Sequence, residues 1–82
     1  MGKSRRAQPR ELARKLRTIR EQLNLSQEEV AKRLQKVEDS VYPGLISRYE
    51  HGKVEPSLIV LLEYSRMARV SLETLVDDKL KI

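Results

Sequence analysis

Apolar residues recur at helical spacing in several short stretches of the chain, and residues that start or stop helices separate these stretches. In the first stretch the spacings are four, three and four, which puts four residues on one helical stripe: Leu12, Leu16, Ile19 and Leu23. No stretch shows the alternation of a half-buried strand. Because a chain of 82 residues holds only one small core, this pattern predicts a compact all-α domain of five short helices.

Residues with strong positional preferences predict where the first two helices begin and end. Pro9 suits a first helical turn, and Asn24 tolerates the left-handed conformation that ends a helix. Ser26 and Glu29 have the spacing of a capping box. A second short helix should therefore follow, with Val30, Ala31 and Leu34 turned inward.

Three further helices are predicted in the second half of the chain. The third spans residues 43–51 and stops at Gly52. Ser57 caps a fourth helix, whose apolar residues are Leu58, Leu61, Leu62 and Met67. Ser71 caps a fifth, with Leu72, Leu75, Val76 and Leu80. The fifth is so short that it needs to dock on the others or on a partner.

Positive charge is concentrated at the N-terminus. The net charge is +5, and residues 1–20 hold eight Lys or Arg against the single acid Glu11. Residues 1–8 lack any apolar pattern, so we interpret them as a flexible basic arm that suits a polyanion. Such an arm either stays disordered or follows the minor groove of DNA. The two interpretations are compatible if the arm is disordered in the free protein and becomes ordered only when DNA is bound.

Several classes of function are disfavoured by composition. The chain has no cysteine and one histidine, His51, so we expect no zinc site, no other metal and no cofactor. Ser40, Ser47, His51 and the acidic residues form no nucleophile, base and orienter arrangement, so we expect no enzyme activity. No apolar run is long enough to span a membrane, and we expect a cytoplasmic protein without a membrane partner.

The predicted third helix has two faces of different chemistry. Leu45, Ile46 and Tyr49 can face the core, while the opposite stripe holds Gly44, Ser47, Arg48 and His51. That stripe can enter a major groove. Arg48 is the sharpest candidate for base recognition, because its planar fork can donate twice to the O6 and N7 acceptors of guanine. Ser47 can add a weaker and less selective contact.

Three segments together resemble the Xre family of helix-turn-helix regulators, which includes phage repressors and Cro proteins. They are LNLSQEEVAKRL at 23–34, ISRYEHGKVEPS at 46–57 and VSLETLV at 70–76, and the resemblance covers about residues 12–75. It implies that residues 9–82 are a helix-turn-helix DNA-binding domain of the phage-repressor type. It also implies that Gln27 touches a backbone phosphate and that Ser47 and Arg48 read bases.

Two further inferences come from the same resemblance. Family members tend to pair an arginine late in the first helix with a glutamate late in the recognition helix, and Arg20 and Glu50 match those places. The resemblance thus implies a structural salt bridge between them. The loop after the recognition helix faces phosphate in the family, which favours Lys53 as a phosphate contact, ahead of His51.

The sequence departs from the family between Ala31 and Ile46, where it is about five residues longer than the usual turn. We therefore predict an extended loop over residues 35–42. Pro43 and Gly44 occupy early recognition-helix positions but carry no hydrogen-bonding side chain, so Gly44 on the base-facing stripe brings backbone close to DNA instead. Two interpretations of Tyr42 stay open: its side chain packs against the loop, or its hydroxyl contacts a phosphate.

We therefore predict a sequence-specific transcriptional regulator, a repressor, whose partner is double-stranded DNA. A homodimer would set two recognition helices about 34 Å apart on a symmetric operator. Self-association is expected at the last helix, through Leu72, Leu75, Val76, Leu80 and Ile82, unless this helix merely closes the monomer core. The alternative is a protein-interaction module, such as an antitoxin or a co-regulator with weak DNA sequence preference. Membrane-surface binding through the arm is a weaker third hypothesis.

Overall fold

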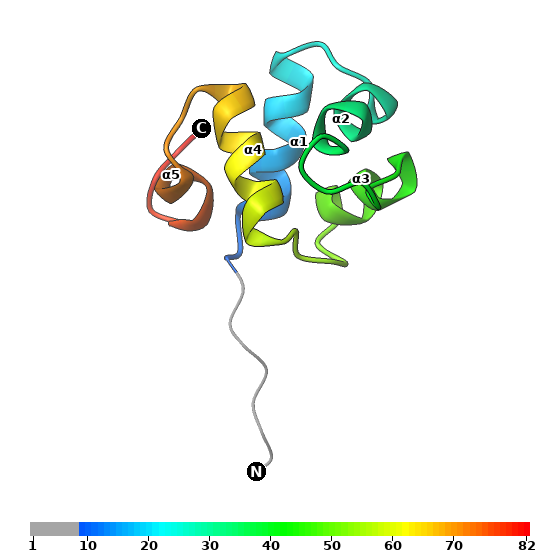
Figure 1. Cartoon of the computed structure of the whole chain (residues 1–82). Coiled ribbons are helices and arrows are strands. Elements are labelled where there is room, and N and C mark those ends of the chain that lie inside the picture. Colours follow the sequence, from blue (N-terminus) through cyan, green and yellow to red (C-terminus); the bar gives the residue numbers. More distant parts are fainter. Residues whose placement is uncertain (1–8) are drawn as a thin grey trace.

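The computed structural model describes residues 9–82, and in this range it contains α-helices joined by loops, with no strand (Figure 1). The helices are α1 (Leu12–Gln22), α2 (Gln27–Leu34), α3 (Pro43–Glu50), α4 (Leu58–Ala68) and α5 (Leu72–Val76). This is the predicted five-helix, all-α architecture. The predicted basic arm, residues 1–8, lies outside the described residues. Within the described part, no helix is long and apolar enough to cross a membrane.

The helices surround one core. In Figure 1, α1 and α4 lie at the centre, α2 and α3 lie together on one side, and α5 lies on the other. The core draws on all five helices and on the loop before α3: Leu12, Leu16, Ile19, Val30, Ala31, Leu34, Val41, Ile46, Tyr49, Val60, Leu61, Tyr64 and Leu75. Burial raises the pKa of the Tyr64 phenol, and its buried hydroxyl has no hydrogen-bond partner within residues 9–82.

The predicted caps are confirmed. Ser26 Oγ accepts the Glu29 N–H at 3.0 Å, and Glu29 Oε1 accepts the Ser26 N–H at 2.8 Å, which is a complete capping box. Ser57 and Ser71 accept backbone N–H groups at the starts of α4 and α5. Asn24 ends α1 with φ of 57°, as expected for a left-handed stop.

Some sequence predictions at the helix ends are wrong. Pro9 lies outside α1, which begins only at Leu12. The backbone N–H groups of Arg10 and Glu11, between Pro9 and the helix, donate to Asp78. Leu23 falls past the end of α1 and is exposed, because the chain turns away at the next residue. Leu58, in the first turn of α4, is 70% exposed and contributes nothing to the core.

The predicted self-association residues at the C-terminus also need correction. Leu75 is fully buried, and Leu72 and Ile82 pack partly against the same core, so these three serve the monomer. Val76 and Leu80 remain exposed. Leu80 lies beyond α5, which ends at Val76. The fifth helix therefore docks on its own chain, which a helix of this length requires.

The C-terminal segment also fixes the start of α1. The carboxylate of Asp78 accepts the backbone N–H of Glu11 on Oδ1 and that of Arg10 on Oδ2, both at 3.0 Å. These two bonds satisfy donors that the start of a helix leaves without intrahelical partners. They also lower the pKa of Asp78 below its ordinary value of 3.8.

We expect the Asp78 carboxylate to make the fold sensitive to acid. Because its pKa is lower in the folded chain than in the unfolded one, its stabilisation is present above the unfolded pKa and is lost as pH falls through the folded pKa. Urea unfolding from about pH 6 down to about pH 2 should show a smaller loss of stability for Asp78→Asn than for wild type. Asp39→Asn, at an exposed carboxyl, is the control. Identical curves for Asp78→Asn and wild type would contradict this role.

Candidate nucleic-acid interface

The α2–α3 pair carries the candidate interface, and an ordered loop joins the two helices. Gln35 Nε2 donates to the carbonyl of Val41 at 2.8 Å, and the Val41 side chain is buried in the core. Near the middle of the loop, Ser40 Oγ donates to Glu38 Oε2 at 3.1 Å. The long connection predicted from the sequence is therefore anchored at both of its ends, and it delivers the chain to α3 in a fixed position.

The start of α3 has no side-chain cap. Tyr42 is the N-cap residue in extended conformation, and its carbonyl accepts the N–H of Leu45 at 2.9 Å. Pro43 then occupies the first turn, where its missing N–H costs nothing. A Cβ placed on Gly44 would lie 2.9 Å from Cε2 of the Tyr42 ring, so a side chain there would require the ring to move. The sequence offered no sign of this contact.

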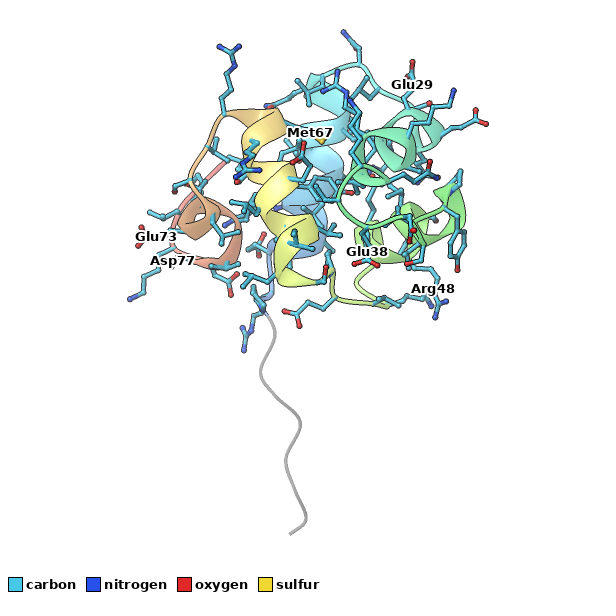
Figure 2. All side chains as sticks on the ribbon, viewed as in Figure 1. Glu29, Glu38, Arg48, Met67, Glu73 and Asp77 are labelled. Atoms are coloured by element: carbon cyan, nitrogen blue, oxygen red, sulfur yellow. The ribbon has the colours of Figure 1, made fainter. Side chains whose placement is uncertain are left out.

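The two faces of α3 separate as the sequence predicts. Ile46 and Tyr49 are buried, and Leu45 is half-buried. On the opposite stripe Gly44, Arg48 and His51 are exposed and Ser47 is half-buried. Figure 2 shows Arg48 extending away from the body of the molecule. Its guanidinium forms no ion pair or hydrogen bond within the described part of the chain, and it is therefore available to a ligand.

The end of α3 is held by a glycine turn. Gly52 has φ of 71°, a conformation that favours glycine, and the N–H of Lys53 donates back to the carbonyl of Arg48 at 2.9 Å. The Lys53 side chain is exposed just beyond this turn. The ring of His51 folds back on the helix, because its Nδ1–H donates to the carbonyl of Ser47 at 2.7 Å. Only its Nε2 is left for another partner.

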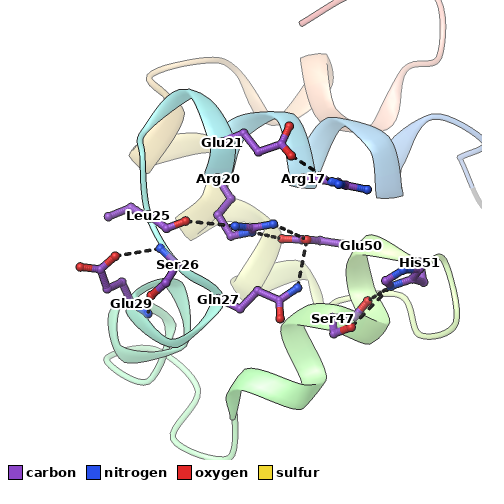
Figure 3. Close-up of polar contacts among 10 residues, drawn as sticks. All are labelled: Arg17, Arg20, Glu21, Leu25, Ser26, Gln27, Glu29, Ser47, Glu50 and His51. Carbon is purple, nitrogen blue, oxygen red and sulfur yellow. Dashed lines mark hydrogen bonds and ion pairs between the residues drawn. The ribbon is translucent and has the colours of Figure 1, made fainter.

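A buried charge network fixes α3 against α1 and α2 (Figure 3). Arg20 and Glu50 form a bidentate ion pair, with Nε to Oε2 at 2.7 Å and Nη2 to Oε1 at 3.1 Å. The side chains of Arg20 and Glu50 are only 17% and 2% exposed. The hydrogen bond to Glu50 raises the pKa of Arg20 above its ordinary value. Arg20 Nη1 also donates to the carbonyl of Leu25 at 3.1 Å.

Gln27, at the start of α2, joins this network. Its Nε2 donates to Glu50 Oε1 at 3.3 Å, and the side chain is half-buried. This contact uses one of the two amide hydrogens and orients the group. The structure thus brings together Arg20, Gln27 and Glu50, while the other predicted site residues lie along the exposed side and the two ends of α3. No group of three or more potential metal ligands is present in residues 9–82.

Two short helices, the second of which presents an exposed polar stripe beside a buried face, define a helix-turn-helix protein. Residues 16–75 match the family model HTH_3, described as helix-turn-helix. The chain therefore belongs to this family of Xre-type helix-turn-helix DNA-binding proteins.

A solved structure has the same fold. The crystal structure of the P22 c2 repressor in complex with a synthetic operator matches with a TM-score of 0.69 and 24% sequence identity. The match covers 88% of this chain and 98% of the repressor chain. At that identity the match establishes the shared fold. No curated protein sequence matches this chain.

Proposed function

We propose that the chain is a sequence-specific DNA-binding regulator that represses transcription and reads the major groove with α3. The observation that carries this proposal is the exposure of Arg48 on one side of α3. The opposite side of this helix is buried in the core, and Glu50 holds it through the ion pair with Arg20. The family supports it, and the P22 c2 repressor, which shares the fold, was crystallised with an operator. On this proposal the protein binds operator DNA and catalyses no reaction. Its proposed location is the cytoplasm, where the operator DNA lies.

Base reading is assigned to the middle of α3. Arg48 donates both arms of its guanidinium to O6 and N7 of one guanine, since it has no competing carboxylate. Ser47 adds a single hydroxyl contact on the same stripe. Gly44 stands at the beginning of this stripe, where the absence of a side chain leaves room for the Tyr42 ring.

Phosphate contacts flank this stripe and position it. Gln27, at the start of α2, donates its second amide hydrogen to a phosphate of the DNA backbone. Lys53 and His51 contact phosphates from the end of α3, and His51 does so through Nε2. Tyr42 adds its hydroxyl on the loop side. Each phosphate that is neutralised by a cation releases counterions, so binding should weaken steeply as salt rises.

Specific binding is proposed to use a homodimer on a two-fold symmetric operator. One recognition helix offers few base contacts, and two helices about 34 Å apart reach successive major grooves. The surface proposed for self-association is a groove beside α4 and α5, whose lining residues are Pro9, Glu55, Pro56, Ser57, Leu58, Leu61 and Val76. It is supported by the exposure of Leu58 and Val76, two large apolar residues that the monomer leaves in solvent.

Replacement of Arg48 tests the proposed function. Arg48→Ala should weaken binding to a selected site by about 1–3 kcal/mol and relax the preference at one guanine. Competition binding against duplexes that vary one base pair at a time measures both effects. Arg66→Ala is the matched control, because it removes an exposed arginine from α4. If Arg48→Ala kept the wild-type preference at every position, Arg48 would not be the base reader; a wild type without preference at any position would favour the alternative of a protein-interaction module.

A further inference from the structure

The ring of Tyr42 occupies a place on the DNA-facing stripe of α3. A Cβ on Gly44 would point out of this stripe, and it would lie 2.9 Å from Cε2 and 3.3 Å from Cδ2 of the Tyr42 ring. The ring therefore fills the space in which a side chain of residue 44 would project. At the first exposed position of the recognition helix, the chain presents an aromatic ring that comes from the residue before the helix.

This ring is exposed, and the backbone that carries it is anchored on both sides. Tyr42 is 48% exposed, although tyrosine has a large apolar ring. Its backbone follows the buried Val41, whose carbonyl accepts from Gln35, and its own carbonyl accepts the N–H of Leu45. The Tyr42 hydroxyl forms no hydrogen bond within the described residues. The extended loop thus places the apolar ring surface at the start of α3.

The chemistry of the major groove indicates what this surface recognises. Most groups there are hydrogen-bond donors or acceptors, and the C5-methyl of thymine is the apolar one. Pro43 and Gly44, beside the ring, have no hydrogen-bonding side chain, so the Tyr42 hydroxyl is the one polar side-chain group within residues 42–44, and the rest of that side chain is apolar. We propose that the Tyr42 ring packs on a thymine methyl group next to the base read by Arg48, and thereby determines specificity. This inference rests on the proposed function.

Deoxyuridine provides the test, because it lacks only the methyl group of thymidine. Each thymine of a selected duplex is replaced in turn by deoxyuridine, and binding is measured for wild type, Tyr42→Phe and Tyr42→Ala. Wild type should lose about fourfold in affinity at one thymine per half-site, the value for one buried methyl-sized group. Tyr42→Phe should keep this sensitivity because it keeps the ring, and Tyr42→Ala should lose it.

Three results would overturn the inference. One is a wild-type affinity that no deoxyuridine changes; another is equal sensitivity in Tyr42→Ala. The third is a Tyr42→Phe variant that behaves like Tyr42→Ala, which would show that Tyr42 acts through its hydroxyl alone and that the ring contributes nothing to base recognition. In each case an intact guanine preference that depends on Arg48 would leave the proposed function standing. Loss of any enriched site would instead remove the proposed function itself.

Discussion

Replacing Arg20 with methionine is expected to lower the free energy of unfolding by about 3–5 kcal/mol. The Glu50 side chain, 2% exposed, would be left in the interior with only the Gln27 amide, at 3.3 Å, as a side-chain partner. Removing one member of a buried pair costs more than the pair contributes, because the remaining charge stays desolvated. Since small domains are stable by about 5–15 kcal/mol, this loss is a large part of the total.

Urea unfolding measures the effect, and the same helix provides the control. Arg17 pairs with Glu21 four residues later, but both side chains are more than half exposed. Arg17→Met should therefore cost only about 0.3–0.5 kcal/mol. A double variant, Arg20→Met with Glu50→Leu, should recover most of the loss, since it removes the orphaned carboxylate. An Arg20→Met variant no less stable than Arg17→Met would show that the network contributes little.

Lys15→Ala is the second change with a large expected effect. Lys15 is fully buried, and its Nζ donates to the carbonyls of Thr74 at 2.7 Å and Asp77 at 2.9 Å. These carbonyls lie at the end of α5, where helices leave acceptors without intrahelical partners. Alanine would remove the ammonium and leave a cavity beneath α5, so we expect a loss of about 2–5 kcal/mol.

Two comparisons separate the causes of that loss. Lys15→Met keeps most of the buried volume and removes only the donor, so its cost should fall to about 1–3 kcal/mol, the cost of orphaned acceptors. Lys36→Ala, at an exposed position, should change stability by less than about 0.5 kcal/mol. Amide exchange at Leu75 should accelerate in Lys15→Ala more than exchange in α2. Unchanged exchange at Leu75 would contradict a specific link between Lys15 and α5.

Features that depend on neighbours in sequence could be predicted without the structure. The capping box of Ser26 and Glu29 and the stops at Asn24 and Gly52 each involve residues a few positions apart. The two faces of α3 follow from its helical period, which separated the buried Tyr49 from the exposed Arg48. Local chemistry was sufficient for these.

Features that depend on distant partners could not be predicted. Lys15 is a charged residue on α1, and only contacts 59 and 62 residues away make it part of the core. Asp78 caps a helix start 67 residues before it. Ring contacts are invisible in the sequence as well, so Gly44 was explained by its closeness to DNA, whereas the structure adds the Tyr42 ring. The exposure of Leu58 likewise depends on how α4 and α5 dock.

The candidate site combines both kinds of feature. Pattern and family resemblance together suggested Arg48, Ser47 and the Arg20–Glu50 pair, and the structure joins Arg20, Glu50 and Gln27 in one network. This network holds the end of α3 against α1 and α2 through Glu50. The loop before α3 holds the start of the helix through the bonds of Val41 and Tyr42. Because α3 is held at both places, its exposed stripe needs little further ordering, which would favour affinity in the proposed DNA complex.

We propose that α3 reads DNA sequence as part of a symmetric dimer. Selection of bound duplexes from a random library, at about 50 and about 200 mM salt, tests it most directly. We expect one enriched site with two-fold symmetry, half-sites about one helical turn apart and much weaker binding at the higher salt. Salt-sensitive binding with no enriched site would contradict sequence reading, and an enriched site without symmetry would contradict the dimer.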